Sequence, residues 1–158
     1  MASYIEIIPT VLLDLPTLYN KAGKVSDINI YSVVNEKEPE TSQIENGLGY
    51  TIKFRNKSFY IRGRSSKEDF DIEPAISYLE EQRTNLIDIE ELAFNWQEVG
   101  CSYFIAPDGE YEDLDFVSLV LLVAEASKGI ILNIDNIWPW SKGLATTDEL
   151  KKRSKILK

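Results

Sequence analysis

The chain has 158 residues, of which 44% are apolar and 27% are charged, and its formal net charge is -9. A chain of this length folds as one domain that buries roughly 68 to 70% of the surface of its unfolded state, and this composition is typical of a globular rather than a disordered protein. The negative net charge argues against nucleic-acid binding, because contacts with phosphates require positive surface.

The sequence contains no histidine and one cysteine, Cys101. Ser-His-Asp and Cys-His machinery, histidine general bases and histidine metal sites are therefore excluded within this chain. One cysteine can form neither an internal disulfide nor a structural zinc site, which favours the cytoplasm as the compartment. We expect no metal and no cofactor. Cys101 follows a glycine and opens an apolar strand, so we expect a buried, inert thiol.

The amino-terminal segment is apolar, but it lacks the basic region of a signal peptide and is interrupted by Glu6, Pro9 and Asp14. It therefore predicts a strand. The longest strongly apolar stretch, Phe116 to Ala126, is about half of the roughly 20 residues that a membrane span needs. We expect a soluble, cytoplasmic protein without a membrane partner.

The first 64 residues predict strands separated by turns, because β-branched and aromatic residues recur in short runs. The strands are expected over residues 3–13, 28–34, 49–54 and 58–64. A short helix is expected from Leu15 to Ala22. The polar residues 35–47 predict an exposed loop.

The segment from Tyr50 to Arg64 predicts a hairpin around Asn56-Lys57. Strand alternation places its apolar residues on one face and its basic residues on the other. The residues expected to point inward are Ile52, Phe54, Phe59 and Ile61. Those expected to point outward include Lys53, Arg55, Lys57, Tyr60, Arg62 and Arg64.

The second half of the chain changes to a helical period. A helix is expected over Asp71 to Gln82, where apolar residues follow the i, i+3, i+4, i+7 spacing. Asp88 can cap a second helix, with Glu91 three residues on, that runs through Trp96 to a stop near Gly100. Trp96 is expected in the core.

Further along, Cys101 to Pro107 predicts a strand, and residues 113–127 are apolar almost all round, which predicts a buried helix. Gly129 is expected to stop this helix before a strand over residues 130–134. Residues 144–158 are expected to form a basic peripheral helix or tail beside a single domain of residues 1–143. Strands first and interleaved helices later predict an α+β domain.

Charge is unevenly distributed along the chain. Glu68 to Asp115 holds fifteen acidic residues and one basic residue, Arg83, whereas residues 53–67 hold six basic residues and no acid. The ordinary explanation is solvated carboxylates and weak surface pairs of about 0 to 1 kcal/mol each. Fifteen acids repel one another, however, and a basic partner would relieve that repulsion.

Five carboxylates lie within residues 108–115. An EF-hand loop beginning at Asp108 would need Gly at its sixth position and Glu at its twelfth, where Asp113 and Leu119 stand, so this segment is not a calcium loop. Asp113 and Asp115 have a structural use, because carboxylates at a helix amino terminus each contribute about 0.3 to 1 kcal/mol. Asp108, Glu110 and Glu112 are assigned to exposed surface and partner contact.

Trp138 and Trp140 bracket a proline, so they either hold the carboxyl-terminal segment on the domain or form exposed interface anchors. Together with carboxylates of the acidic region they complete the candidate partner-binding set. Its members are Glu80, Glu81, Glu90, Asp108, Glu110, Glu112, Trp138 and Trp140.

Two other classes of function remain open from the residues. A carboxylate-dependent hydrolase needs a pair of acids across a cleft, but acidic pairs are so abundant here that one carries almost no information. The Glu-x-Lys pattern of metal-dependent nucleases occurs only at Glu149-Leu150-Lys151. A dimeric structural or adaptor protein could associate through a sheet edge or its tryptophans. We expect a binding protein and not an enzyme.

The stretch from Leu92 to Trp140 resembles the carboxyl-terminal part of small acidic bacterial immunity proteins. The matching positions are Trp96, Gly100, Gly129, Asp135 and Trp138. The resemblance implies a protein that binds and blocks a cognate toxin, as in type VI or contact-dependent secretion systems. Contact residues vary between such pairs, so the resemblance transfers none. The sequence thus predicts a cytoplasmic immunity protein that neutralises a basic toxin through acidic complementarity and active-site occlusion.

Overall fold

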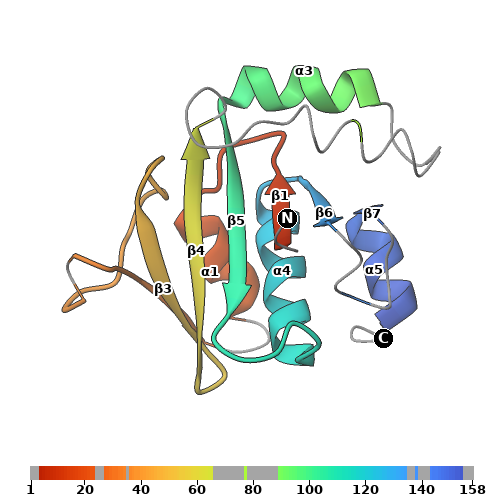
Figure 1. The fold of residues 1–158 in the computed structure, drawn as a ribbon. Coiled ribbons are helices and arrows are strands. Elements are labelled where there is room, and N and C mark those ends of the chain that lie inside the picture. The colour runs from red at the N-terminus through yellow and green to blue at the C-terminus, as the bar shows by residue number, and fades with distance from the viewer. Residues whose placement is uncertain are drawn as a thin grey trace.

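The computed structural model describes residues 4–23, 27–34, 36–65, 77, 89–134, 138 and 143–154. Within these ranges the chain forms one antiparallel sheet of seven strands in the order β2-β3-β4-β5-β1-β6-β7 (Figure 1). The strands are β1 (Tyr4–Ile8), β2 (Ile28–Ser32), β3 (Gly49–Phe54), β4 (Lys57–Ser65), β5 (Cys101–Pro107), β6 (Ile130–Ile134) and β7 (Gly143–Ala145). The described helices are α1 (Leu15–Ala22), α3 (Ile89–Val99), α4 (Leu114–Ala126) and α5 (Thr147–Ser154). The predicted α+β class is confirmed.

Helices α1, α4 and α5 lie on one face of the sheet, behind it in Figure 1, and α1 and α5 both contact α4. Helix α3 lies across the end of the sheet where β5 begins. The core fills the space between the sheet and α4. Alternate strand residues point into it, as Ile5 and Ile7 of β1 do, and both are fully buried. This alternation follows from the two-residue period of a strand.

Helix α4 is the buried helix that the sequence predicts over residues 113–127. Ten of its thirteen residues are buried, because the sheet covers one side and α1 and α5 cover others. A helix that is apolar all round is stable only when it is covered in this way. No helix in the described ranges is both long and apolar enough to cross a membrane.

The predicted helix from Leu15 to Ala22 is confirmed as α1. The carboxylate of Asp14 caps it, because Asp14 Oδ2 accepts from the backbone nitrogen of Thr17 at 3.1 Å and from Thr17 Oγ1 at 2.6 Å. The loop predicted over residues 35–47 is confirmed for residues 36–47, which are largely exposed and contain only isolated bridges. Ile44 is the exception and is buried.

Strands β1 and β2 are shorter than predicted. Strand β1 ends at Ile8, before Pro9, whose backbone nitrogen cannot donate to a ladder. The next two nitrogens, of Thr10 and Val11, both donate to the carbonyl of Ser127 at 3.1 Å. Strand β2 ends at Ser32, and Val34 beyond it is 81% exposed.

The predicted hairpin is present, but its turn is displaced by one residue. The central residues are Arg55 and Asn56, with φ of 52° and 61°, and Phe54 pairs with Lys57. Two consecutive positive φ values are the geometry of the two-residue turn whose twist matches that of the flanking strands. The prediction of inward-facing apolar residues is confirmed, since all four are buried: Ile52, Phe54, Phe59 and Ile61.

The sequence predicts that Gly100 and Gly129 end two helices. The structure shows that α3 and α4 end with different backbone geometry. Helix α3 ends as predicted at Gly100, which has φ of 81° and donates to the carbonyl of Trp96 at 2.9 Å. After α4 the left-handed residue is Lys128, with φ of 49°, and not Gly129. Glycine is needed at 129 because a Cβ there would lie 2.8 Å from the carbonyl oxygen of Ile8. Of the helix predicted over residues 71–82 the structure describes Ser77 alone, which is helical and exposed; the other residues of this helix and the cap at Asp88 lie outside the described ranges.

The sequence predicts a basic peripheral helix or tail over residues 144–158, and the described part of this segment contains helix α5, which packs against α4. Residues Gly143–Ala145 pair with β6 as an edge strand. Leu150 of α5 is fully buried, and Lys151 Nζ lies 2.6 Å from Glu125 Oε1 of α4. The reason is amphipathicity, because Ala145 and Leu150 supply apolar contacts beneath an otherwise charged helix.

Candidate partner-binding surface

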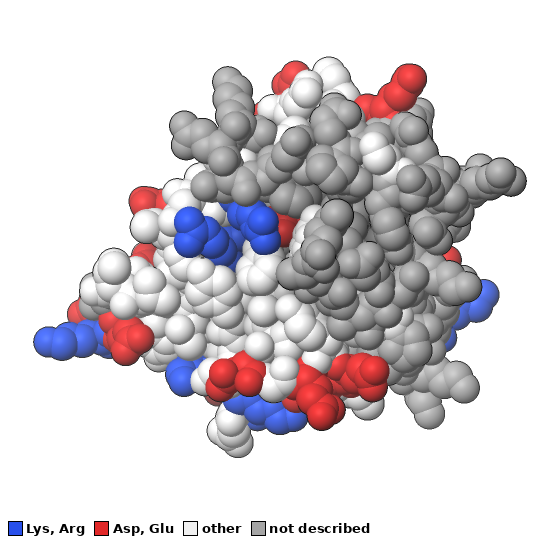
Figure 2. Space-filling model, viewed as in Figure 1, with Lys and Arg blue, Asp and Glu red and all other residues white. Residues whose placement is uncertain are grey.

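The acidic loop, residues 108–112, connects β5 to α4 at the end of the sheet opposite α3. Asp108, Glu110 and Glu112 are all exposed. Figure 2 shows acidic side chains together with basic ones at this lower end of the molecule. The prediction that these three carboxylates lie on the surface is confirmed.

The next two carboxylates of the motif are already neutralised within the chain. Arg55 Nη1 lies 2.9 Å from Asp115 Oδ1, and Lys57 Nζ lies 2.9 Å from Asp113 Oδ2 and 2.7 Å from Asp115 Oδ2. Asp113 also caps α4, since its Oδ1 accepts from the backbone nitrogen of Asp115 at 2.9 Å. The basic hairpin and the amino terminus of α4 therefore hold each other in place.

Two members of these ion pairs, Asp115 and Lys57, have shifted pKa values. The hydrogen bond from Lys57, and then that from Arg55, lowers the pKa of Asp115 below 3.8, although desolvation opposes the shift. Hydrogen bonds to Asp115 and Asp113 raise the pKa of Lys57 above 10.5. A partner's cations would thus meet Asp108, Glu110 and Glu112, because Asp113 and Asp115 already have cationic partners.

Replacing Lys57 with methionine is expected to raise the pKa of Asp115 toward its ordinary value of 3.8, because the strongest hydrogen bond to the carboxylate is lost. The carboxyl carbon resonance of Asp115, followed by NMR against pH, measures this directly. Lys53→Met is the matched control, since Lys53 Nζ contacts Ser58 Oγ at 2.6 Å on the same hairpin. An unchanged Asp115 titration in the Lys57 variant would contradict the assignment.

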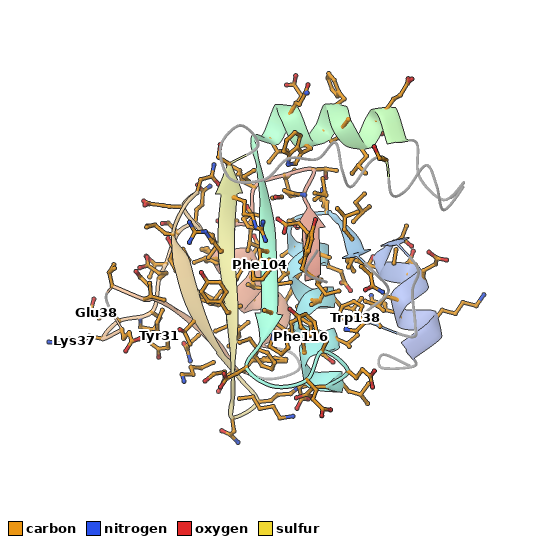
Figure 3. The ribbon with its side chains drawn as sticks, in the orientation of Figure 1. Tyr31, Lys37, Glu38, Phe104, Phe116 and Trp138 are labelled. Carbon is orange, nitrogen blue, oxygen red and sulfur yellow. The ribbon has the colours of Figure 1, made fainter. Side chains whose placement is uncertain are left out.

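The backbone of the acidic loop is tied to the core through Trp138. Trp138 Nε1 donates to the carbonyl of Tyr111 at 2.7 Å. The Trp138 ring packs edge-on against Phe116 of α4, with centroids 5.8 Å apart (Figure 3). The Tyr111 ring also packs edge-on against Phe116, with centroids 5.5 Å apart. A loop held at its middle and at its base presents its carboxylates in a defined arrangement.

Trp138 is therefore not a partner-binding residue, although the sequence predicts it as one. It is 1% exposed, so it holds the chain to the core and is not an exposed anchor. Asn133 supports it, because Asn133 Oδ1 accepts from the Trp138 nitrogen at 3.4 Å. Trp140, Glu80 and Glu81 lie outside the described residues. Trp96 is 5% exposed, as predicted for a core residue.

Glu90 is exposed on α3, far from the acidic loop. Strand β5 runs from the end of α3 to the acidic loop. Its seven residues, at roughly 3.3 Å each, place the helix and the loop about 23 Å apart. On the face shown in Figure 2, acidic side chains are visible at the top, along the left edge and at the bottom, and a basic cluster lies in the middle. Among the described residues the predicted acidic surface is thus divided between the two ends of the sheet.

A hollow of about 400 Å³ separates the hairpin from the acidic loop. It is lined on one side by Lys57 and Ser58 and on the other by Pro107, Asp108 and Asp113. A second hollow, of about 550 Å³, lies on the other flank of the hairpin. Within the described ranges no three His, Cys, Asp or Glu side chains are grouped closely enough to hold a metal.

A buried charged group on the sheet was not anticipated from the sequence. Glu6, on the interior strand β1, is fully buried, and its Oε2 accepts from Ser102 Oγ at 2.6 Å. Arg64 Nη2 lies 3.5 Å from Glu6 Oε1, and the Arg64 guanidinium covers the Phe104 ring at 4.6 Å. In the sequence Glu6 alternates with isoleucines, and this pattern predicts a half-buried strand in which Glu6 lies on the opposite face from the isoleucines.

Burial dominates the titration of Glu6. Desolvation raises the pKa of this carboxyl from 4.5 to about 7, although Arg64 and Ser102 lower it. Glu6 therefore binds a proton near neutral pH without contact with solvent. Cys101 is buried, as predicted, and burial raises the pKa of its thiol, so it is a weak nucleophile.

No protein-family model matches the chain. Comparisons with curated proteins and with solved structures found no significant match either.

Proposed function

We propose that the protein binds and neutralises a basic protein toxin, and that the acidic loop enters the toxin's active site. The observation that carries the proposal is the set of three exposed carboxylates on a loop whose base and backbone are fixed to the domain. The resemblance to bacterial immunity proteins, made on residues of the same region, supports the same class of function.

Fixation of the loop favours affinity. Binding by a mobile loop loses side-chain and backbone entropy, and a loop that is already ordered loses less. Tyr111 is held by Trp138, and Asp113 is held by Lys57 and by the helix that it caps. Asp108, Glu110 and Glu112 can therefore meet a complementary set of cations with little rearrangement.

The negative charge of the acidic loop favours a partner with a positive surface. Three carboxylates within five residues attract a positive surface and accelerate its association, and the effect weakens as salt screens it. A toxin that acts on phosphate-containing substrates needs a basic active site, so an acidic loop can occupy the place of the substrate. Occlusion would then block the toxin without any chemistry in the inhibitor.

Reversing the loop's charge is expected to weaken binding to the protein encoded by the adjacent gene about 10- to 100-fold, mainly through slower association. The variant is Asp108→Lys, Glu110→Lys and Glu112→Lys, and surface plasmon resonance at 150 mM salt measures the affinity. The carboxylates removed are exposed, so the variant should remain folded.

A matched variant reverses three exposed carboxylates elsewhere, Glu36→Lys, Glu38→Lys and Glu45→Lys, with the same change in net charge. It should bind within threefold of the wild-type protein. Equal weakening by both variants would mean that net charge alone matters and would overturn the role of the loop. Failure of the wild-type protein to bind its neighbour at physiological salt would overturn the proposed function.

A further inference from the structure

Helix α3 has a buried side and an open side. Leu92 and Trp96 are 3% and 5% exposed, and Val99 packs partly buried against the core. The opposite side carries exposed residues at helical spacing, and we name it the outer face of α3. Its members are Glu90, Glu91, Phe94, Gln97 and Glu98.

Phe94 stands in the middle of this outer face and is 60% exposed. Glu90 and Glu91 precede it by four and three residues, and Gln97 and Glu98 follow it by three and four, so polar side chains surround the ring on the helix surface. An apolar centre with a polar rim is the anatomy of a protein interface. The core does not use Phe94, because Leu92 and Trp96 already fill the inner side of the helix.

The charge of α3 indicates whether a second copy of this chain or a different protein binds its outer face. Helix α3 contains three glutamates and no basic residue. Packing α3 of one molecule on α3 of a second copy would bring like charges together, which disfavours a symmetric dimer here. Glu90 and Glu91 also interact within the chain, so the kind of partner is inferred from Phe94 and Glu98. Phe94 favours a partner with an apolar pocket, and Glu98 favours basic residues around that pocket.

We infer that the outer face of α3 is a second protein-docking surface, which inserts Phe94 into an apolar pocket bordered by Lys or Arg on a partner protein. This inference goes beyond the proposed function, because α3 and the acidic loop lie at opposite ends of the sheet (Figure 1). A contact confined to α3 would leave the acidic loop accessible. The two surfaces can therefore be tested separately.

Site-specific crosslinking in cells of the source organism identifies the occupant. Phe94→p-benzoylphenylalanine should give a discrete protein adduct, whereas the same substitution at Val34, which is 81% exposed at the far edge of the sheet, should not. The partner identified from the adduct is then produced and purified on its own, and its affinity for the wild-type chain is measured by calorimetry. Phe94→Ala is expected to weaken that affinity at least tenfold, and Glu98→Lys should also weaken it.

Two controls separate this result from a folding defect and from the acidic loop. Phe94→Ala should keep the wild-type unfolding midpoint, because the ring is exposed. The triple Lys variant of the acidic loop should bind the α3 partner as the wild-type chain does. Absence of a position-specific adduct, an acidic docking surface on the captured protein, or a Phe94→Ala affinity within twofold of wild type would overturn the inference.

Discussion

Replacing Trp138 with alanine is expected to lower the free energy of unfolding by about 3 to 5 kcal/mol, the usual range for removal of a large buried aromatic side chain. Trp138 is 1% exposed and packs against Phe116 with ring centroids 5.8 Å apart. Its indole also donates to Tyr111, so the substitution frees the middle of the acidic loop. Urea unfolding followed by circular dichroism measures the change.

Two further substitutions distinguish the contributions of Trp138. Trp138→Phe retains most of the apolar volume but removes the donor to Tyr111, so it should cost less than Trp138→Ala. Phe94→Ala removes an exposed aromatic side chain and should change the unfolding free energy by no more than about 0.5 kcal/mol. A Trp138→Ala cost below about 1 kcal/mol would contradict the role of Trp138 in joining loop and core.

Stability is expected to fall as the pH rises from about 4.5 to about 7, by about 3 kcal/mol, because of Glu6. The folded-state pKa lies above the unfolded value, so between these values the folded chain holds a proton that the unfolded chain has released. That proton stabilises the folded state at low pH. Its contribution declines through this range and is lost above the folded-state pKa.

The Glu6 effect can be isolated because the chain has no histidine, the side chain whose ordinary pKa lies in this range. Urea unfolding at a series of pH values from 4.5 to 8 measures the slope. Glu6→Gln cannot titrate and should flatten the profile over this window. A wild-type profile without a downward slope, or an equal slope in Glu6→Gln, would show that Glu6 is not the titrating group.

Local patterns predicted most of the elements correctly. Alternation in the segment from Tyr50 to Arg64 identified which residues of β3 and β4 are buried, because a strand directs successive side chains to opposite faces. The apolar run from Phe116 to Ala126 identified α4 as a buried helix. The turn of the hairpin was placed one residue late, because both Arg55-Asn56 and Asn56-Lys57 contain the asparagine that favours positive φ.

The candidate surface was predicted less completely. Exposure of Asp108, Glu110 and Glu112 follows from their polarity and from the turn residues around them. The burial of Trp138 could not be decided locally, because proline-flanked tryptophans occur both in cores and at interfaces. The exposure of Phe94 could not be predicted from the sequence, because an aromatic residue in an amphipathic helix is more often part of the face that packs on the core.

By itself, the sequence determined the nature of the elements and the absence of histidine chemistry, since both depend on residue identity and on neighbours within one or two turns. Only the tertiary structure decided which charges remain available to a partner. Arg55 and Asp115 are 60 positions apart, and Glu6 and Ser102 are 96 apart. Their pairing depends on the strand order, which places β1 between β5 and β6 and brings the hairpin to the start of α4. Coulomb attraction and desolvation depend on distance and burial in space, and neither can be inferred from separation along the chain.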